Sequence, residues 1–404
     1  MTIREISPTV TQNICKAIVL RLLHKIHVGH LTVLLPDGRE EHFGDRGSPL
    51  TADMTISDYR FFSDVVLRGD VGLGESFMQG AWDTKDIPGL FRLFIKNRQA
   101  LQEGYPAAEW LCSQKNRLLY NPRKNTPIGS RGNIQQHYDL SNEFFQKFLD
   151  PSMLYSCGIY SSEKDSCEAA QKNKINSIIE KAQIKATDHV LEIGCGWCGF
   201  AVEAVKQTQC RLTGITVSRA QYELALDRVK KEGLEKNIEI RLQDYREIKG
   251  LYDKIVSIEM LEAVGHRYFG KFFQCCDRLL KPGGLFVIQV ITIPDQRYDD
   301  YRWKTDWIKK YIFPGGVLPS VTVLSQAATK YSSFIMENLK DIGTHYAVTL
   351  KDWREKYLSN IESISAMGFN NVFRRKWEYY LAICEAGFAE RVLGDIQVVF
   401  RKPV

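Results

Sequence analysis

Residues 190–199 read Val190-Leu-Glu-Ile-Gly-Cys-Gly-Trp-Cys-Gly199, and the fold class can be inferred from them. An apolar run ends in an acidic residue and a Gly-x-Gly turn, and a segment with helical spacing follows. Glycine suits such a turn because the backbone must bend tightly and let a ligand approach closely. The stretch therefore predicts a strand, a ligand-binding turn and a helix.

The same order of strand, turn and helix continues along the chain. Apolar strands are predicted at 188–193, 210–215, 238–242, 252–258 and 285–293, with helices at 199–207 and 219–232 between them. Strands that alternate with helices form a mostly parallel sheet with right-handed crossovers. We therefore expect an α/β fold of the Rossmann-like kind.

The glycine turn favours S-adenosylmethionine as its ligand, with NAD as the competing interpretation. The spacing Glu-x-Gly-x-Gly differs from the dinucleotide pattern Gly-x-Gly-x-x-Gly. Asp244 and Tyr245 follow the third predicted strand, where an acid can reach an adenine amino group. Such a turn also lies where open parallel sheets bind their ligands.

The second strand leads into Gly214-Ile-Thr-Val-Ser-Arg-Ala-Gln221. Most methyltransferases of this fold carry an acid here, whereas Thr216, Ser218 and Gln221 can offer only neutral hydrogen bonds. Cys195 and Cys198 form a Cys-x-x-Cys pair, but the cofactor turn accounts for their spacing without a redox role. No second cysteine pair stands at zinc-site spacing, so we expect no metal.

Length and composition indicate two domains and no disulfide scaffold. A chain of 404 residues exceeds one ordinary core, and ten cysteines are too sparse for a disulfide framework. The net charge of +6 comes without a nucleic-acid-binding signature, so we expect no nucleic acid, although the charge permits attraction to anionic lipid. The first residues lack the apolar run of a signal peptide, so a cytoplasmic protein is expected.

The amino-terminal part reads as a small mixed domain. Residues 30–38 predict a strand that enters a Pro-Asp-Gly turn, and residues 56–67 predict a further strand or buried segment. The basic run 115–124 is interpreted as a linker, with lipid-headgroup contact as the alternative. Domains are therefore expected at 1–125 and 126–404.

Further motifs run along the carboxyl-terminal two thirds of the chain. They are His137-Tyr-Asp-Leu-Ser-Asn-Glu-Phe-Phe145, Met153-Leu-Tyr-Ser-Cys157, Glu259-Met-Leu-Glu-Ala-Val-Gly265, Tyr311-Ile-Phe-Pro-Gly-Gly-Val-Leu-Pro-Ser320 and Tyr379-Tyr-Leu-Ala-Ile-Cys-Glu-Ala-Gly-Phe388. In these motifs, and in the stretches 190–199 and 214–221 quoted above, the chain resembles cyclopropane-fatty-acyl-phospholipid synthases and their mycolic acid and plant cyclopropane synthase relatives. The resemblance implies a class I S-adenosylmethionine-dependent methyltransferase domain with a mostly parallel seven-stranded sheet. It also implies a smaller N-terminal α+β lipid-handling domain.

The resemblance also assigns residues to the site. Contacts with the methyl donor are implied for Tyr138, Tyr155, Ser156, Val190, Glu192, Gly194, Cys195, Gly196, Thr216, Ser218, Gln221, Asp244 and Tyr245. A bicarbonate ion is implied as the base, held beside the reacting carbons by Cys157, Glu262, Gln289, Ile291 and Tyr346. Cys384 matches the cysteine given as the active-site residue of the family, although alkene methylation leaves a thiolate nothing to attack.

The chemistry of Glu262 and Gln289 leads to two specific predictions. A carboxylate beside an anion repels it unless it is protonated, so a raised pKa is expected for Glu262. Bacterial family members usually have histidine where this chain has Gln289. Glutamine can donate a hydrogen bond to an anion but cannot carry a charge or a proton.

The expected reaction transfers a methylene from S-adenosylmethionine to the cis double bond of unsaturated acyl chains in membrane phospholipids. Because of Gln289, a C-methyltransferase that makes methyl- or methylene-branched chains stays open as the alternative, and a small-molecule N-methyltransferase is a second one. The expected partner is a phospholipid bilayer, with the protein peripheral on its surface and 115–124 and 374–376 as candidate headgroup contacts. A homodimer is left open.

Overall fold

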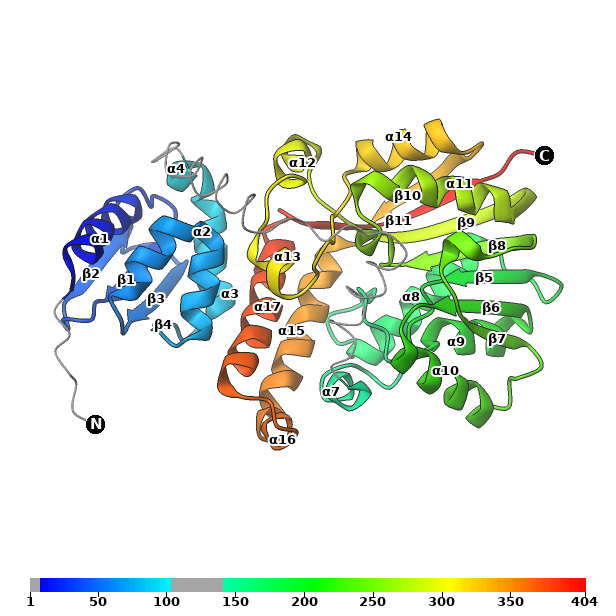
Figure 1. Cartoon of the computed structure of the whole chain (residues 1–404), viewed down its shortest axis with the longest axis horizontal. Helices are drawn as coiled ribbons and strands as arrows, with labels where there is room; N and C mark the ends of the chain where they lie inside the picture. The colour runs from blue at the N-terminus through cyan, green and yellow to red at the C-terminus, as the bar shows by residue number, and fades with distance from the viewer. Residues whose placement is uncertain (1–7, 103–140) are drawn as a thin grey trace. The chain divides into compact units, whose positions relative to one another are not determined.

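The computed structural model describes residues 8–102 and 141–404. These residues form two compact units, each assembled from separate parts of the sequence (Figure 1). The first unit groups 8–102 with Lys304–Tyr311 and Ile361–Glu390, and the second comprises 141–303, Ile312–Asn360 and Arg391–Val404. The predicted domain boundary between residues 125 and 126 assigns Lys304–Tyr311 and Ile361–Glu390 to the second domain. Both segments instead group with the amino-terminal residues in the first unit.

The first unit contains a four-stranded sheet in the order β2-β1-β3-β4. Its strands are β1 (His30–Leu34), β2 (Glu40–Gly44), β3 (Thr51–Ile56) and β4 (Trp82–Asp83). β1 and β2 are antiparallel and are joined by the Pro-Asp-Gly turn, in which Gly38 has a φ of 81°. The predicted strand and turn at 30–38 are confirmed.

Helices of the first unit come from all three of its segments. They are α1 (Val10–Leu23), α2 (Arg60–Met78), α3 (Ile87–Lys96), α4 (Arg98–Gln102), α13 (Trp307–Tyr311), α16 (Ile361–Ala366) and α17 (Asn371–Ala389). The prediction of a strand over 56–67 is wrong beyond Ile56, because α2 begins at Arg60. The same segment is buried as predicted at Phe61 and Phe62, which face the core from the first turn of the helix.

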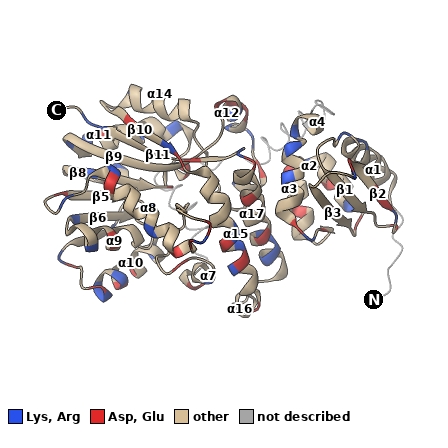
Figure 2. Cartoon of the chain, turned by 180° about the vertical axis from the view of Figure 1, so that it is seen from behind, with Lys and Arg blue, Asp and Glu red and all other residues tan. Residues whose placement is uncertain are grey.

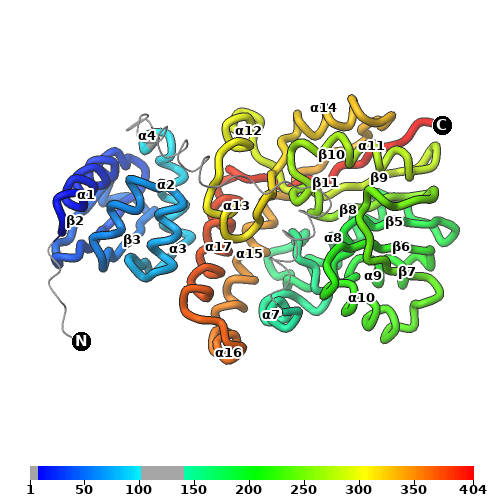
Figure 3. Tube along the Cα trace, in the orientation of Figure 1, coloured from blue at the N-terminus to red at the C-terminus, as the bar shows by residue number. Residues whose placement is uncertain are grey.

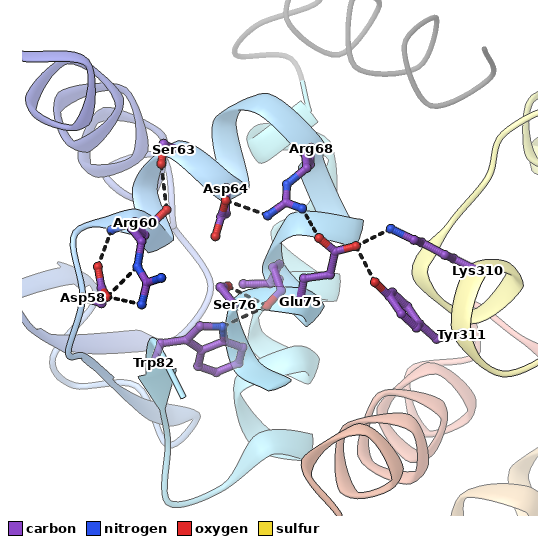
Figure 4. Close-up of polar contacts among 11 residues, drawn as sticks. Asp58, Arg60, Ser63, Asp64, Arg68, Glu75, Ser76, Trp82, Lys310 and Tyr311 are labelled. Carbon is purple, nitrogen blue, oxygen red and sulfur yellow. Dashed lines mark hydrogen bonds and ion pairs between the residues drawn. The ribbon is translucent and has the colours of Figure 1, made fainter. Parts of the chain in front are cut away.

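A buried carboxylate ties segment 304–311 to α2 (Figure 4). Glu75 accepts a hydrogen bond from the Tyr311 hydroxyl at 2.6 Å and pairs with Lys310 and with Arg68. Arg68 also pairs with Asp64 one turn earlier in α2, at 2.6 Å. Because Glu75 is mostly buried, its three partners are needed to offset the cost of placing its charge inside the unit.

The second unit is built on a seven-stranded sheet in the order β10-β11-β9-β8-β5-β6-β7. Its strands are β5 (His189–Ile193), β6 (Arg211–Thr216), β7 (Ile238–Leu242), β8 (Tyr252–Ile258), β9 (Leu280–Thr292), β10 (Ile335–Asp341) and β11 (Gly394–Arg401). The first five run parallel, and β11 pairs antiparallel with both β9 and β10. Figure 3 shows how β8, β9 and β11 lie side by side although β11 is the last strand of the chain. The five strands predicted from the sequence and the mostly parallel seven-stranded sheet are confirmed.

Helices cover both faces of this sheet (Figure 1). They are α7 (Asn142–Gln146), α8 (Cys167–Ala182), α9 (Gly199–Thr208), α10 (Arg219–Lys231), α11 (Phe269–Leu279), α12 (Asp295–Tyr301), α14 (Val321–Tyr331) and α15 (Gly343–Ser359). Alternate strand residues enter two hydrophobic clusters: Val190 packs with α8 and α9 residues, and Leu191 packs with α11 and α14 residues. Burial on both faces explains the nearly continuous apolar sequence of β5.

Charged residues of both signs are interspersed on the helices of the second unit. Figure 2 shows Lys and Arg beside Asp and Glu on α8 and α10, which carry the one-turn pairs Glu168–Lys172 and Arg219–Glu223. Such exposed pairs contribute little to stability individually. Across residues 8–102 and 141–404, no helix is both long enough and apolar enough to span a membrane.

Candidate active site

A pocket lies at the carboxyl ends of the parallel strands in the second unit. β6 and β8 flank β5 on opposite sides, so the loops that follow these strands diverge and leave a crevice. The lining residues are 153–156, 192–197, 215–217, 221, 243–246, 258–260, 263 and 264. The pocket is therefore in the place where a sheet of this topology binds its ligand.

The glycine turn after β5 has the geometry of a ligand cradle. Gly194 and Gly196 have φ values of 84° and 52°, in the left-handed region that favours glycine. A Cβ at Gly194 would lie 2.7 Å from Met260 Cγ, whereas a Cβ at Gly196 would enter open space. The backbone amides of Gly194 and Cys195 donate to the Ile215 carbonyl at 3.0 and 2.9 Å, which fixes the turn against β6.

Most of the predicted donor-binding residues line this pocket. They are Tyr155, Ser156, Glu192, Gly194, Cys195, Gly196, Thr216, Gln221, Asp244 and Tyr245. Glu192 is buried at the end of β5, and its Oε2 has no hydrogen-bond partner among the described residues. Burial raises its pKa to about 8. A buried unpaired carboxyl oxygen at the pocket wall fits a bound ligand that carries hydrogen-bond donors.

Three predicted donor contacts require correction or lie outside the description. Val190 does not line the pocket, because the strand pleat turns its side chain into the cluster on the α8 and α9 face. Ser218 does not line it either, because its hydroxyl accepts from the Gln221 amide at 3.3 Å and caps α10. Tyr138 lies outside the described residues.

Asp244 reaches the pocket as half of an ion pair. Arg246 donates from Nε to Asp244 Oδ1 at 2.8 Å and from Nη2 to Oδ2 at 2.6 Å, a two-point contact that orients the carboxylate. Thr216 donates from Oγ1 to Gln221 Oε1 at 2.8 Å on the neighbouring loop. Gln243 and Arg246 also line the pocket but were not predicted from the sequence. The one sequence feature that could have indicated them is their position next to Asp244 and Tyr245.

The two cysteines of the glycine turn do not have a redox environment. Cys195 and Cys198 are buried free thiols, and burial raises the pKa of each well above its usual value. Reactive cysteines require a lowered pKa and access to solvent. Within the described ranges, no group of three His, Cys, Asp or Glu side chains is arranged to hold a metal ion.

A second polar cluster surrounds Glu259, which follows β8 and lines the pocket. Its Oε1 accepts from the Cys157 amide at 2.8 Å and from Gln289 Nε2 at 2.7 Å, and its Oε2 accepts from the Tyr346 hydroxyl at 2.7 Å. The Glu259 backbone has a φ of 47°, an unfavourable value for a non-glycine residue that is typical of functional sites. Sequence reasoning missed Glu259, although it stands three residues before Glu262 in the same motif.

Glu262 lies on the short helix Leu261–Ala263, behind Glu259. Its Oε1 accepts from the Ile291 amide at 2.6 Å, and its buried Oε2 has no partner among the described residues. Burial, and then the negative charge of Glu259, raise the pKa of Glu262 to about 8, in agreement with the predicted direction. Glu262 does not line the pocket.

Two further ionisable side chains, Asp395 and Lys174, are buried near Glu259 and Glu262. Asp395 on β11 is fully buried and accepts from Gln289 Nε2 at 3.1 Å. Burial and the neighbouring Glu259 raise the Asp395 pKa well above its usual value. Lys174, also buried, donates to Ser156 Oγ at 2.5 Å. Burial therefore disfavours the charged form of both Glu262 and Asp395, and Lys174 is a basic side chain buried near them.

The predicted catalytic residues thus fall into two groups. Cys157, Glu262, Gln289, Ile291 and Tyr346 all contact Glu259 or one another. Cys384 does not line the pocket and lies on α17, which belongs to the first unit. Burial raises its pKa to about 12, so the thiol stays protonated.

Comparisons with known proteins agree with this geometry. The family model for mycolic acid cyclopropane synthetase matches residues 126–398. The tuberculostearic acid methyltransferase of Mycobacterium tuberculosis is 36% identical over 337 residues, which are 81% of this chain and 78% of that protein. The cyclopropane-fatty-acyl-phospholipid synthase of Escherichia coli strain K12 is 36% identical over 356 residues, 87% of this chain and 88% of the synthase.

A solved structure is also similar to this chain. It is the mycolic acid cyclopropane synthase CmaA1 complexed with SAH and CTAB, with a TM-score of 0.63 and 27% sequence identity. The match covers 67% of this chain and 98% of that one.

Proposed function

The chain belongs to the mycolic acid cyclopropane synthetase family of S-adenosylmethionine-dependent enzymes, and we propose that it forms cyclopropane rings at the cis double bonds of acyl chains in membrane phospholipids. The synthase of Escherichia coli, similar over most of both chains, supports this substrate. The observation that carries the proposal is the carboxylate of Glu259, held by three donors at the wall of the donor pocket.

The residues of the pocket suit the methyl donor. When bound, S-adenosylmethionine supplies an electrophilic methyl group, whose transfer to an alkene carbon leaves a carbocation that closes to a ring by losing a proton. Gly194 and Gly196 admit the donor close to the backbone, and the Arg246-oriented Asp244 can accept from an adenine amino group. The pocket ring of Tyr155 stacks on Trp353 at 5.2 Å and offers an aromatic face that stabilises a cation without reacting with it.

The proton needs a base within the same dry cluster. A bicarbonate ion, predicted for this role, would need the donors of Cys157, Gln289 and Tyr346, and all three donate to Glu259. An added anion would also lie beside the Glu259 carboxylate, which would repel it. The arrangement therefore fits a carboxylate of the protein better than a bicarbonate ion. Glu259 accepts the proton as the ring closes, with Tyr346 and Gln289 holding its orientation.

A branched product is the second candidate. The relative from Mycobacterium tuberculosis, named a tuberculostearic acid methyltransferase, is as similar to this chain as the synthase is. The same carbocation gives a methylene branch if a hydride first shifts from the methyl-bearing carbon to the cationic carbon, and the new methyl group then loses a proton to form a C=CH2 bond instead of a ring. The two products therefore differ in whether Glu259 takes the proton from the new methyl group before or after the hydride shift.

Action on assembled membranes is the remaining part of the proposal. We place the enzyme on the cytoplasmic surface of the bilayer, because its substrate bonds are buried among acyl chains and the described cysteines are all free thiols. Of the candidate headgroup contacts, 115–124 lies outside the described residues. Arg375 is engaged within the first unit, where it donates to Asp83 at 3.0 Å and to the Trp82 carbonyl at 2.9 Å. Whether the enzyme acts as a homodimer is tested by sedimentation.

Product analysis tests the proposed function. Purified enzyme is incubated with S-adenosylmethionine and vesicles of a cis-unsaturated phospholipid, and Glu259→Gln serves as the control. A cyclopropane and a methylene branch have the same mass, so proton NMR must separate ring methylene signals from vinylidene signals. Ring signals support the cyclopropane synthase, vinylidene signals support the branching enzyme, and unmodified lipid contradicts both.

A further inference from the structure

The side-chain amide of Gln289 lies between two sets of partners. Its Nε2 donates to Glu259 Oε1 at 2.7 Å, to Asp395 Oδ2 at 3.1 Å and to the Cys157 carbonyl at 3.3 Å. Its Oε1 accepts from Gln397 Nε2 at 3.0 Å. Gln289 and Gln397 are paired residues of β9 and β11, and both are fully buried. Water therefore cannot replace a partner if either amide turns.

Gln397 takes its own orientation from α8. Its Oε1 accepts from the Ser177 hydroxyl at 3.0 Å and from the Lys181 ammonium. Ser177 and Lys181 are one helical turn apart and so lie on the same face of α8. Burial lowers the pKa of Lys181 to about 8, and its Nζ is the donor in the contact with Gln397 Oε1.

The Lys181 ammonium sets the direction of each hydrogen bond in the series that runs from Lys181 through Gln397 and Gln289 to Glu259. An ammonium can only donate, so Gln397 must turn its carbonyl oxygen toward Lys181 and its amino group toward Gln289. Gln289 must then present its oxygen to Gln397 and its amino group to Glu259. The orientation of each side-chain amide thus fixes the orientation of the next one.

We propose that Lys181 is a positioning residue, which acts through Gln397 to set the direction in which Gln289 donates to Glu259. The inference rests on the proposed function, in which Glu259 takes a proton from the substrate. With the chain reversed, the Gln289 carbonyl oxygen would face the Glu259 carboxylate, and a donor would be replaced by a repulsive contact in a buried site. Lys181 would thus influence the reaction without touching the substrate.

Gln397→Glu tests the direction of these hydrogen bonds with little change in the size of the side chain. A carboxylate at 397 accepts from Lys181 and also from Gln289, so Gln289 must turn its amino group away from Glu259. We expect kcat to fall about tenfold, the scale of one misdirected buried hydrogen bond. The acid limb of the pH–rate profile should move to higher pH, because the base loses a donor. The KM for S-adenosylmethionine should not change.

Two substitutions on α8 complete the test. Lys181→Met removes the ammonium and leaves the Ser177 hydroxyl, so a smaller loss of kcat with the same movement of the acid limb is expected. Lys172→Met is the matched control, because Lys172 is exposed on the same helix and pairs only with Glu168 in the described contacts. It should behave as the wild type.

A spectroscopic measurement separates this inference from the proposed function. The side-chain amide signals of Gln289 in nitrogen-15 labelled protein, identified by their loss in Gln289→Glu, should shift in Gln397→Glu and Lys181→Met but not in Lys172→Met. These signals need no substrate, so they report the chain direction even if the wild type makes no cyclopropane. Unshifted signals in both variants overturn the inference. Slow turnover with an unmoved pH profile overturns it as well, because that result indicates a structural role only.

Discussion

Replacing Glu262 by glutamine should make the folded protein less sensitive to rising pH. The Glu262 carboxyl is buried, with one oxygen bound to the Ile291 amide at 2.6 Å and the other without a partner among the described residues. Burial and the charge of Glu259 raise its pKa from 4.5 to about 8. Glutamine imitates the protonated acid in size and hydrogen bonding but does not titrate.

The sign and size of the effect follow from the two pKa values. Between pH 4.5 and 8 the unfolded chain releases the Glu262 proton and the folded chain keeps it. The stability that this proton contributes is fully present below the unfolded pKa and is lost as the pH rises through the folded value. Since one pKa unit corresponds to about 1.4 kcal/mol, the wild type should lose at most about 4 kcal/mol from this group between pH 5 and pH 8.

Urea unfolding at pH 5 and at pH 8 measures this loss. Wild type and Glu262→Gln are compared at each pH, because the other buried acids, such as Asp395 and Glu192, are present in both proteins. The free energy of unfolding of Glu262→Gln relative to wild type should rise by about 1–3 kcal/mol from pH 5 to pH 8. A difference that is the same at both pH values would refute the protonated, buried state of Glu262.

Four further predictions concern the reaction and the membrane. Glu259→Gln should lower turnover by about 10²-fold or more, the scale of losing a general base, with intact binding of S-adenosylhomocysteine by calorimetry and no rescue by added bicarbonate; turnover at the wild-type rate would exclude Glu259 as the base. Gly194→Val should abolish S-adenosylhomocysteine binding, because φ is 84° and the new Cβ would lie 2.7 Å from Met260 Cγ, and unchanged affinity would contradict the donor site. Cys384→Ser should retain turnover, because burial raises the thiol pKa to about 12, and an inactive but folded variant would contradict this. Flotation with anionic vesicles should weaken as salt rises, and salt-independent binding would indicate a purely apolar contact.

The sheet of the second unit was predictable because its signals are local. Five apolar runs, the first two of them followed by helical segments, correspond to β5 through β9, although β9 begins five residues before the predicted start. The glycine turn could be located because its conformation requires glycine at Gly194 and Gly196. Val190 was misplaced because Val190, Leu191 and Ile193 of β5 are all apolar, and only the strand pleat decides which of them face the pocket.

The base and its support were not predictable from local signals. Glu259 is one acid among many in the sequence, and its role depends on donors from Cys157, Gln289 and Tyr346, which are far apart along the chain. Nothing in the sequence near Cys384 indicates that α17 groups with the amino-terminal residues. Segment 56–67 was misread because Phe61 and Phe62 suit a strand as well as the first turn of a helix.

The composition of the first unit limits how this protein can be cut or recombined. Within it, α17 packs through Tyr379 against Phe77 and against Trp307, with ring centroids 5.4 and 4.7 Å apart. A gene fragment that encodes residues 126–404 would produce α17 and α13 without α2, and their apolar side chains would be left in water. A chimera that takes its amino-terminal module from a relative must therefore exchange three separate stretches together. Recombination at one crossover point would instead pair an α17 of one parent with an α2 of the other, and would succeed only where both parents share the aromatic contacts.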